Sequence, residues 1–163
     1  MKTTTEANHT TGLGTLLKEH HRELNDRFGQ LVARSREGDP IDLRSAWTSF
    51  ERELLCHMEI EEAEILPGFA RQDAVGARAI LAEHAAIRTA LLQMGLDLDL
   101  HLLRAELVEA FVEQLKAHAR QEEGTLYDWA ERHAAPGASH SVKTSLKELA
   151  DAGAGRLAFR EGA

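Results

Sequence analysis

Cysteine is almost absent from this sequence, which has a single residue of this type, Cys56, in 163. One thiol excludes an intramolecular disulfide and a zinc site built from several cysteines, and it is typical of a reducing compartment. Proline occurs only three times, which leaves long stretches free to be helical. Basic residues are also in deficit, with 19 Lys and Arg against 27 Asp and Glu and a net charge of −8. We therefore expect no nucleic-acid partner and no attraction to an anionic membrane surface.

Long apolar runs are missing too, since no stretch has the length and apolar character of a membrane span. The N-terminal segment is polar and lacks the apolar core of a secretory signal. We expect a cytoplasmic protein whose first residues, Met1 to about Thr10, are poorly ordered. The length suffices for one domain that buries a core without cross-links.

Helix-favouring residues, above all Ala, Leu, Glu and Arg, dominate the chain. Turn signals divide it into five predicted helices, over residues 11–37, 40–70 (kinked at Pro67-Gly68), 73–94 (ending before Gly95), 99–133 and 141–150. The alternating stretch 96–100 has no strand partner and is expected to be a loop. The pattern predicts an all-α fold, an antiparallel up-down four-helix bundle with a short additional C-terminal helix. The expected organisation is a tail over 1–10, the bundle over 11–134, and a linker, short helix and tail over 135–163.

Histidine, in contrast, is abundant, with nine residues. An internal repeat with an offset of 61 residues relates the second predicted helix to the fourth, so that His57 corresponds to His118 and Glu61 to Glu122. Apolar residues at spacings of three and four accompany both pairs: Phe50, Leu54 and Ile65 in one helix, Phe111, Leu115 and Leu126 in the other. Each His-x-x-x-Glu pair is therefore expected on the helix face turned to the core.

The first and third predicted helices each add one histidine with the same apolar surroundings. His84 and His21 both have apolar residues at −4, +3, +7 and +10. The neighbouring His20 shares its face with polar residues and is expected to point to solvent or to the helix edge. A buried carboxylate is costly unless it is paired or bound to a cation. Four imidazoles and the carboxylates of Glu61 and Glu122 therefore predict a metal site inside the bundle.

The donor set narrows the choice of metal. Imidazole and carboxylate suit iron, manganese or zinc. Six ligands exceed the four that a structural zinc needs, and carboxylates can bridge, so two metal ions are favoured. Positions would remain open for water, an oxo or hydroxo bridge, or a small diatomic ligand. The alternative interpretation is a metal-free helical interaction module, in which these histidines are core residues with satisfied hydrogen bonds.

Four segments resemble the hemerythrin family, specifically its HHE cation-binding, hemerythrin-like domain, over about residues 13–134: LLKEHHREL (16–24), HMEIEEAEILP (57–67), EHAAI (83–87) and HARQEEGTL (118–126). The resemblance implies a non-heme centre of two iron ions (Fe²⁺/Fe³⁺), oxo- or hydroxo-bridged. It further implies that Glu61 and Glu122 bridge the ions, that one ion is bound by His21 and His57, and that the other is bound by His84 and His118.

The function implied by the resemblance is to bind or sense O₂, NO or peroxide, or to buffer iron. The alternative is a di-iron oxidoreductase that turns over peroxide or NO. The oxygen-carrying members of the family have a further histidine where this chain has Arg88, and an Asp at +5 where it has Glu122 at +4. Reversible O₂ transport is therefore not expected. We expect Arg88 to lie at the bundle edge, with an ion pair to Glu62 as the alternative.

The remaining residues of chemical interest receive structural interpretations. Cys56 is turned away from the ligand face and is expected to be an inert, partly buried residue. Tyr127 is expected to pack between helices, although it could reach the metal pocket. The histidines without a repeat partner are expected to be exposed: His9, His101, His133 and His140.

Overall fold

The computed structural model describes residues 12–37 and 40–158 of the chain. Within these ranges the chain is helical and contains no β-strand. The elements are α1 (Leu13–Glu37), α2 (Pro40–Ile60), the π-helical turn η1 (Glu61–Ile65), α3 (Leu66–Phe69), α4 (Ala74–Asp99), α5 (Ala105–Gly124), α6 (Leu126–His133) and α7 (Ala138–Ala158). The prediction of an all-helical protein is thus confirmed for the described residues.

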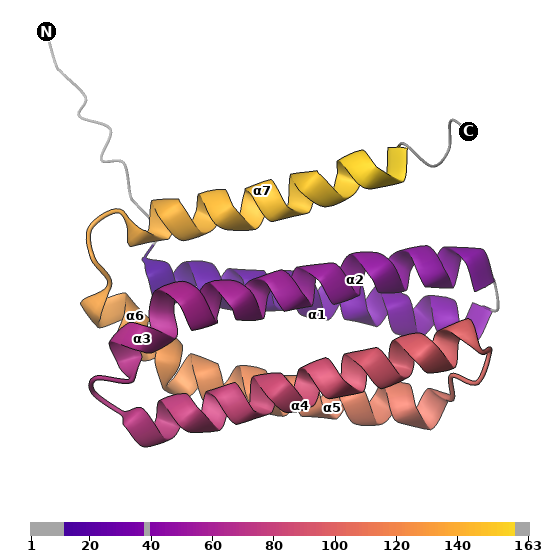
Figure 1. The fold of residues 1–163 in the computed structure, drawn as a ribbon, viewed down its shortest axis with the longest axis horizontal. Coiled ribbons are helices and arrows are strands. Elements are labelled where there is room, and N and C mark those ends of the chain that lie inside the picture. Colours follow the sequence, from indigo (N-terminus) through magenta and orange to yellow (C-terminus); the bar gives the residue numbers. More distant parts are fainter. Residues whose placement is uncertain (1–11, 38–39, 159–163) are drawn as a thin grey trace, which may run out of the picture.

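The long helices α1, α2, α4 and α5 run side by side in Figure 1. Contacts join α1 to α2 and α5, and α4 to α2 and α5, so each of these helices has two long neighbours. The helix α7 packs on the outer side of α1 and α2, while α3 and α6 meet at one end of the molecule (Figure 1). Among the described residues, no helix is both long and apolar enough to cross a membrane.

The third predicted helix does not end before Gly95, and its continuation corrects the predicted loop. In the structure α4 runs on to Asp99. The chain leaves the helix at His101, two residues after its last residue, with a positive φ of 58°. The backbone N–H of Leu102 donates to the carbonyl of Asp97 at 2.7 Å, so that His101 occupies the left-handed position that glycine commonly takes after a helix. Because histidine gives no such signal in a sequence, the sequence pattern predicts an end for this helix, before Gly95, that is too early.

The two repeat helices are each interrupted close to their carboxylate, at Glu61 in one and at Thr125, shortly after Glu122, in the other. After α2, the turn η1 begins at Glu61, whose carbonyl accepts the N–H of Leu66, five residues later. The irregularity expected at Pro67 therefore begins earlier in the chain, at Glu61. The fourth predicted helix starts at Ala105 rather than residue 99 and splits into α5 and α6 around Thr125, whose φ of −129° and ψ of −75° are not helical. π-turns of this kind are frequent at functional sites.

The C-terminal helix α7 is longer than predicted, since it spans Ala138–Ala158 rather than residues 141–150. The predicted N-terminal tail lies outside the described residues, as does the Gly38-Asp39 turn.

The buried apolar side chains form two clusters. The first contains Leu13, Leu17, Ile60, Ile65, Leu66, Phe69, Ala77, Ile80, Leu126, Tyr127, Ala130 and Val142. The second contains Leu24, Phe28, Leu31, Trp47, Phe50, Leu54, Met58, Ile87, Leu91, Met94, Val108 and Phe111. Along α1 and α4, His21 and His84 each lie between a residue of the first cluster and a residue of the second. The predicted ligands therefore form a polar layer between two apolar clusters.

The second cluster offers a test of the packing in two adjacent residues. Leu91 is 1 % exposed, and its neighbour Leu92 is 68 % exposed. Substitution Leu91→Ala removes buried surface and leaves a cavity, so we expect the free energy of unfolding to fall by about 2–5 kcal/mol. The control Leu92→Ala should change it by less than about 0.5 kcal/mol. Urea unfolding of both variants, in the same metal state, measures the difference; equal effects would contradict the predicted helix register.

Candidate metal centre

The structure brings all six predicted ligands together. Buried side chains of His21 (α1), His57 (α2), Glu61 (η1), His84 (α4), His118 and Glu122 (α5) meet in the polar layer, and none is more than 6 % exposed. They form two groups suited to a metal ion, and within each group the potential ligand atoms lie within 4.8 Å of one another. One group is His21, His57, Glu61 and Glu122, and the other is His84, His118 and Glu122.

The two carboxylates connect the helices. Glu122 Oε2 lies 3.3 Å from His21 Nε2 and 3.2 Å from His118 Nε2, and its Oε1 lies 3.1 Å from His84 Nε2. Glu61 Oε1 lies 3.2 Å from His57 Nε2, and its Oε2 lies 3.5 Å from His84 Nε2. All four imidazoles thus present Nε2 to the carboxylates, and each carboxylate contacts histidines of more than one helix.

The outward ring nitrogens, Nδ1, also have partners. For three of the four histidines the partner is a carboxylate: Glu62 Oε1 at 2.8 Å from His84 Nδ1, Glu83 Oε2 at 2.7 Å from His118 Nδ1, and Glu123 Oε1 at 3.4 Å from His21 Nδ1. Such a partner orients an imidazole and makes it a more basic ligand. The apolar periodicity does not predict these outer contacts to the histidines, although Glu62 and Glu123 directly follow the repeat carboxylates.

Arg88 takes part in this outer set, which corrects the expectation that it lies at the bundle edge. Its Nη1 donates to Glu62 Oε1 at 2.7 Å, so the pairing weighed as the alternative is the one found. Burial raises the pKa of Glu62, but the hydrogen bonds from Arg88 and His84 outweigh it and leave the pKa lowered. Glu62 therefore remains a carboxylate that can hold the His84 ring in place.

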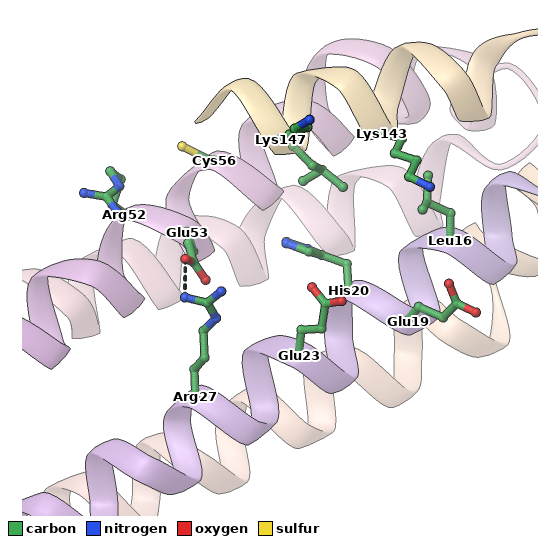
Figure 2. A pocket seen from close by; sticks show the side chains of 11 residues that line it. Leu16, Glu19, His20, Glu23, Arg27, Arg52, Glu53, Cys56, Lys143 and Lys147 are labelled. Atoms are coloured by element: carbon green, nitrogen blue, oxygen red, sulfur yellow. Dashed lines mark ion pairs between the residues drawn. The ribbon is translucent and has the colours of Figure 1, made fainter. Parts of the chain in front are cut away.

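His20 is the fourth outer partner, and the expectation that it points to solvent or to the helix edge is also corrected. Its Nδ1 lies 2.9 Å from Nδ1 of His57. Burial, together with the neighbouring His57 and His21, lowers the pKa of His20 to about 3, so the ring is neutral. His20 also lines a pocket of about 300 Å³ between α1, α2 and α7 (Figure 2). Cys56 lines the same pocket, and burial raises the pKa of its thiol, which agrees with the inert role expected for it.

Tyr127 lies inside the cluster rather than between helices as expected. Its fully buried hydroxyl is 2.8 Å from His21 Nε2 and 3.0 Å from His57 Nε2, and it donates a short hydrogen bond to Glu61 Oε1. In a continuous α-helix a residue five positions after Glu122 would lie about 140° away around the axis. The break at Thr125 removes this rotation and turns the phenol into the polar layer. The alternative stated for Tyr127, that it could reach the metal pocket, is therefore the one found; Gly124, the last residue of α5, lies directly before the break.

A close approach of α1 to α6 supports this placement. A Cβ atom added to Gly14 would lie 2.2 Å from the backbone oxygen of Tyr127, so only glycine fits there. At the same junction Glu131 Oε2 accepts the backbone N–H of Thr15 at 2.9 Å, and Lys18 pairs with Asp128 at 2.8 Å. These contacts fix the start of α6, and with it the phenol, against α1.

The electrostatics of the layer are those of buried anions held by cations. Burial raises the pKa of Glu61, but nearby His57 and hydrogen bonds from His57 and His84 outweigh it, and the pKa falls well below its ordinary value. Hydrogen bonds from His21 and His84 likewise lower the pKa of Glu122 against burial and the repulsion of Glu61. In return, burial lowers the pKa of His84, but the hydrogen bonds to Glu122 and Glu61 prevail and raise it to about 10.

Hydrogen bonds alone do not satisfy every buried polar atom of this layer. Two buried atoms, Glu61 Oε2 and His118 Nε2, have no hydrogen-bond partner within the described residues. A buried polar atom without a hydrogen bond is costly, and each of these two atoms belongs to one of the two groups of potential ligands. Cations bound by these groups would satisfy the carboxylate oxygen and the imidazole nitrogen, so the donor set fits a metal. The histidines outside the layer, His101, His133 and His140, are exposed as expected, and His9 lies outside the described residues.

Comparison with known proteins agrees with this geometry. The family model described as "Hemerythrin HHE cation binding domain" matches residues 13–130. No curated protein and no solved structure gave a match. The matched range covers well over half of the chain and includes the whole buried His/Glu cluster. The family match and the cluster together indicate a metal site. The chain therefore belongs to the hemerythrin HHE cation-binding domain family.

Proposed function

We propose that this chain holds a non-heme centre of two iron ions and uses it to bind or sense O₂, NO or peroxide, or to buffer iron. The observation that carries the proposal is the pair of overlapping ligand groups that share Glu122. Two groups joined by a carboxylate suit two ions better than one, because the combined set exceeds what a single four-coordinate ion uses. Nitrogen and oxygen donors without thiolate suit iron, with manganese and zinc as the alternatives.

The proposed assignment follows the two halves of the molecule. His21 and His57 would hold one ion, His84 and His118 the other, and Glu61 and Glu122 would bridge them. The four long helices that supply these residues form, on this proposal, the antiparallel up-down bundle of the family. When bound, iron would supply a redox couple and open coordination positions for a small ligand.

Contacts among the chain's own residues orient the proposed ligands without a bound ion. The outer partners Glu62, Glu83, Glu123 and His20 contact the Nδ1 atoms and hold each Nε2 toward the centre. The two apolar clusters lie on either side of the layer and exclude water from it. A dry, preorganised set of ligands suits the binding of a small reactive molecule and its protection from side reactions.

Metal content provides the direct test. Iron-loaded protein should contain about two iron ions per chain, as the two ligand groups require. In the variant His84→Ala this should fall by at least half, because His84 contacts both carboxylates. The control His140→Ala, at an exposed histidine, should retain the full content. Metal analysis together with the optical spectrum of the oxidised protein makes the measurement. Wild-type protein that holds well under one iron per chain after reconstitution would overturn the proposal.

The raised pKa of His84 predicts how proton and metal compete. In metal-free protein the imidazolium stabilises the fold fully below its unfolded pKa of 6.5, and this contribution is lost as the pH rises toward about 10. The free energy of unfolding of chelator-treated protein should therefore fall between pH 6.5 and 9. The fall should be weaker in His84→Gln and after metal loading, because metal replaces the proton. Urea unfolding at several pH values tests this; parallel slopes in all three samples would contradict it.

The number of peroxide or NO molecules that each chain consumes distinguishes the oxidoreductase alternative from a function in binding or sensing. We expect one stoichiometric reaction of the reduced, iron-loaded protein with peroxide or NO, because the centre is enclosed between two apolar clusters. Stopped-flow measurement with excess oxidant and a small-molecule reductant makes the test. Sustained consumption over many cycles would favour the enzyme instead.

A further inference from the structure

The phenol of Tyr127 lies among the proposed ligands of one half of the centre. Besides His21 Nε2 at 2.8 Å and His57 Nε2 at 3.0 Å, its oxygen is 3.4 Å from Glu122 Oε2 and is in short contact with Glu61 Oε1. These are the four residues of the first group of potential ligands. A fifth potential donor residue, which offers an oxygen, is therefore already in place beside that group.

The distances from the Tyr127 oxygen to the neighbouring ligand atoms distinguish two cases. In one the phenol lies beside the other ligands of a bound ion, and in the other it occupies the position of the ion itself. Metal–nitrogen and metal–oxygen bonds are about 2.0–2.2 Å long, so adjacent ligand atoms around one octahedral ion lie about 2.8–3.1 Å apart. The distances from the phenol oxygen to His21 and His57 fall in this range, whereas Glu61 Oε1 lies closer and Glu122 Oε2, at 3.4 Å, lies farther. An oxygen occupying the metal position itself would lie about 2.1 Å from each nitrogen. The phenol is thus placed like one more ligand on the same ion.

The repeat shows that this donor belongs to one half only. The residue 61 positions before Tyr127 is Leu66, which has no donor atom. The outer partners also differ, because the Nδ1 of His57 contacts the imidazole of His20 where the Nδ1 of His118 contacts the carboxylate of Glu83. The half formed by His21 and His57 therefore has one more oxygen donor and one fewer carboxylate outer partner than the half formed by His84 and His118.

We propose that Tyr127 is a metal ligand, bonded through its phenolate oxygen to the ion held by His21 and His57. The inference rests on the proposed metal centre. On binding, the phenolic O–H bond breaks, the oxygen donates an electron pair to the cation, and the proton, which the O–H donates toward Glu61 Oε1 in the metal-free protein, is released to bulk solvent. The ion held by His84 and His118 then has fewer protein ligands, so an external small molecule binds at that ion.

The sequence permits a clean test, because it contains one tyrosine. Tag-free protein loaded with Fe(II) and oxidised to Fe(III) should show a visible phenolate-to-iron charge-transfer band. Resonance Raman excitation in that band should enhance phenolate ring modes, and these should shift in protein made with ring-deuterated tyrosine. With a single tyrosine in the chain, such a shift assigns the ligand to Tyr127 in unmodified protein. Absence of phenolate modes from iron-loaded wild-type protein would overturn the inference.

Two variants separate this inference from the proposed function. Tyr127→Phe should lose the band while retaining iron. Trp129→Phe, on the same helix but packed against Phe69 outside the layer, should keep both. If wild-type protein takes up no iron, the proposed function fails. If it takes up iron and Tyr127→Phe leaves the visible spectrum unchanged, the phenol is a hydrogen-bond donor and the inference alone fails.

Discussion

Burial of two carboxylates without contact to water is the constraint on which the rest of this structure depends. Glu61 and Glu122 are fully buried, and an isolated ionised carboxylate in such a place would be strongly destabilising. Each of the long helices α1, α2, α4 and α5 therefore contributes an imidazole at the same level. The outer partners, the glycine at the α1–α6 junction and the irregular turns after Glu61 and Glu122 all serve to bring donors to these two side chains.

The outer contacts reveal an approximate twofold relation between the halves of the chain. The residue before the histidine of α1 or α4 contacts the histidine of α2 or α5: His20 with His57, and Glu83 with His118. The residue after each repeat carboxylate contacts the histidine of the opposite half: Glu62 with His84, and Glu123 with His21. The relation is broken in two places, at His20 and at Tyr127. An ancestral duplication would account for the symmetry, and the two departures make the halves chemically different.

Much of the site could be anticipated because it depends on local periodicity. His57, Glu61, His118 and Glu122 recur with the same apolar spacing, and that spacing alone determines which helix face they occupy. Their convergence is now seen in the structure, while their role as ligands stays a prediction. The outer partners were harder to find, since they require knowledge of which helices cross at which height.

Features that depend on departures from regular helix were not accessible in the same way. Tyr127 reaches the layer because the helix breaks at Thr125; Gly124 marks a weak point there, but a single glycine in a helical pattern does not determine how the following residues turn. The end of α4 depends on the left-handed backbone conformation of His101. A glycine at this position would have indicated the helix end in the sequence. In both cases tertiary packing overrides the preference of the local sequence.

The polar layer divides the hydrophobic interior into two parts that do not merge. The protein therefore resembles two small half-cores joined through a plane of imidazoles and carboxylates. An ion in that plane ties all four long helices to one point, so its loss would loosen the link between the half-cores without emptying either of them. On the proposed function, a bound ion would therefore strengthen the coupling between the two ends of the molecule when they unfold.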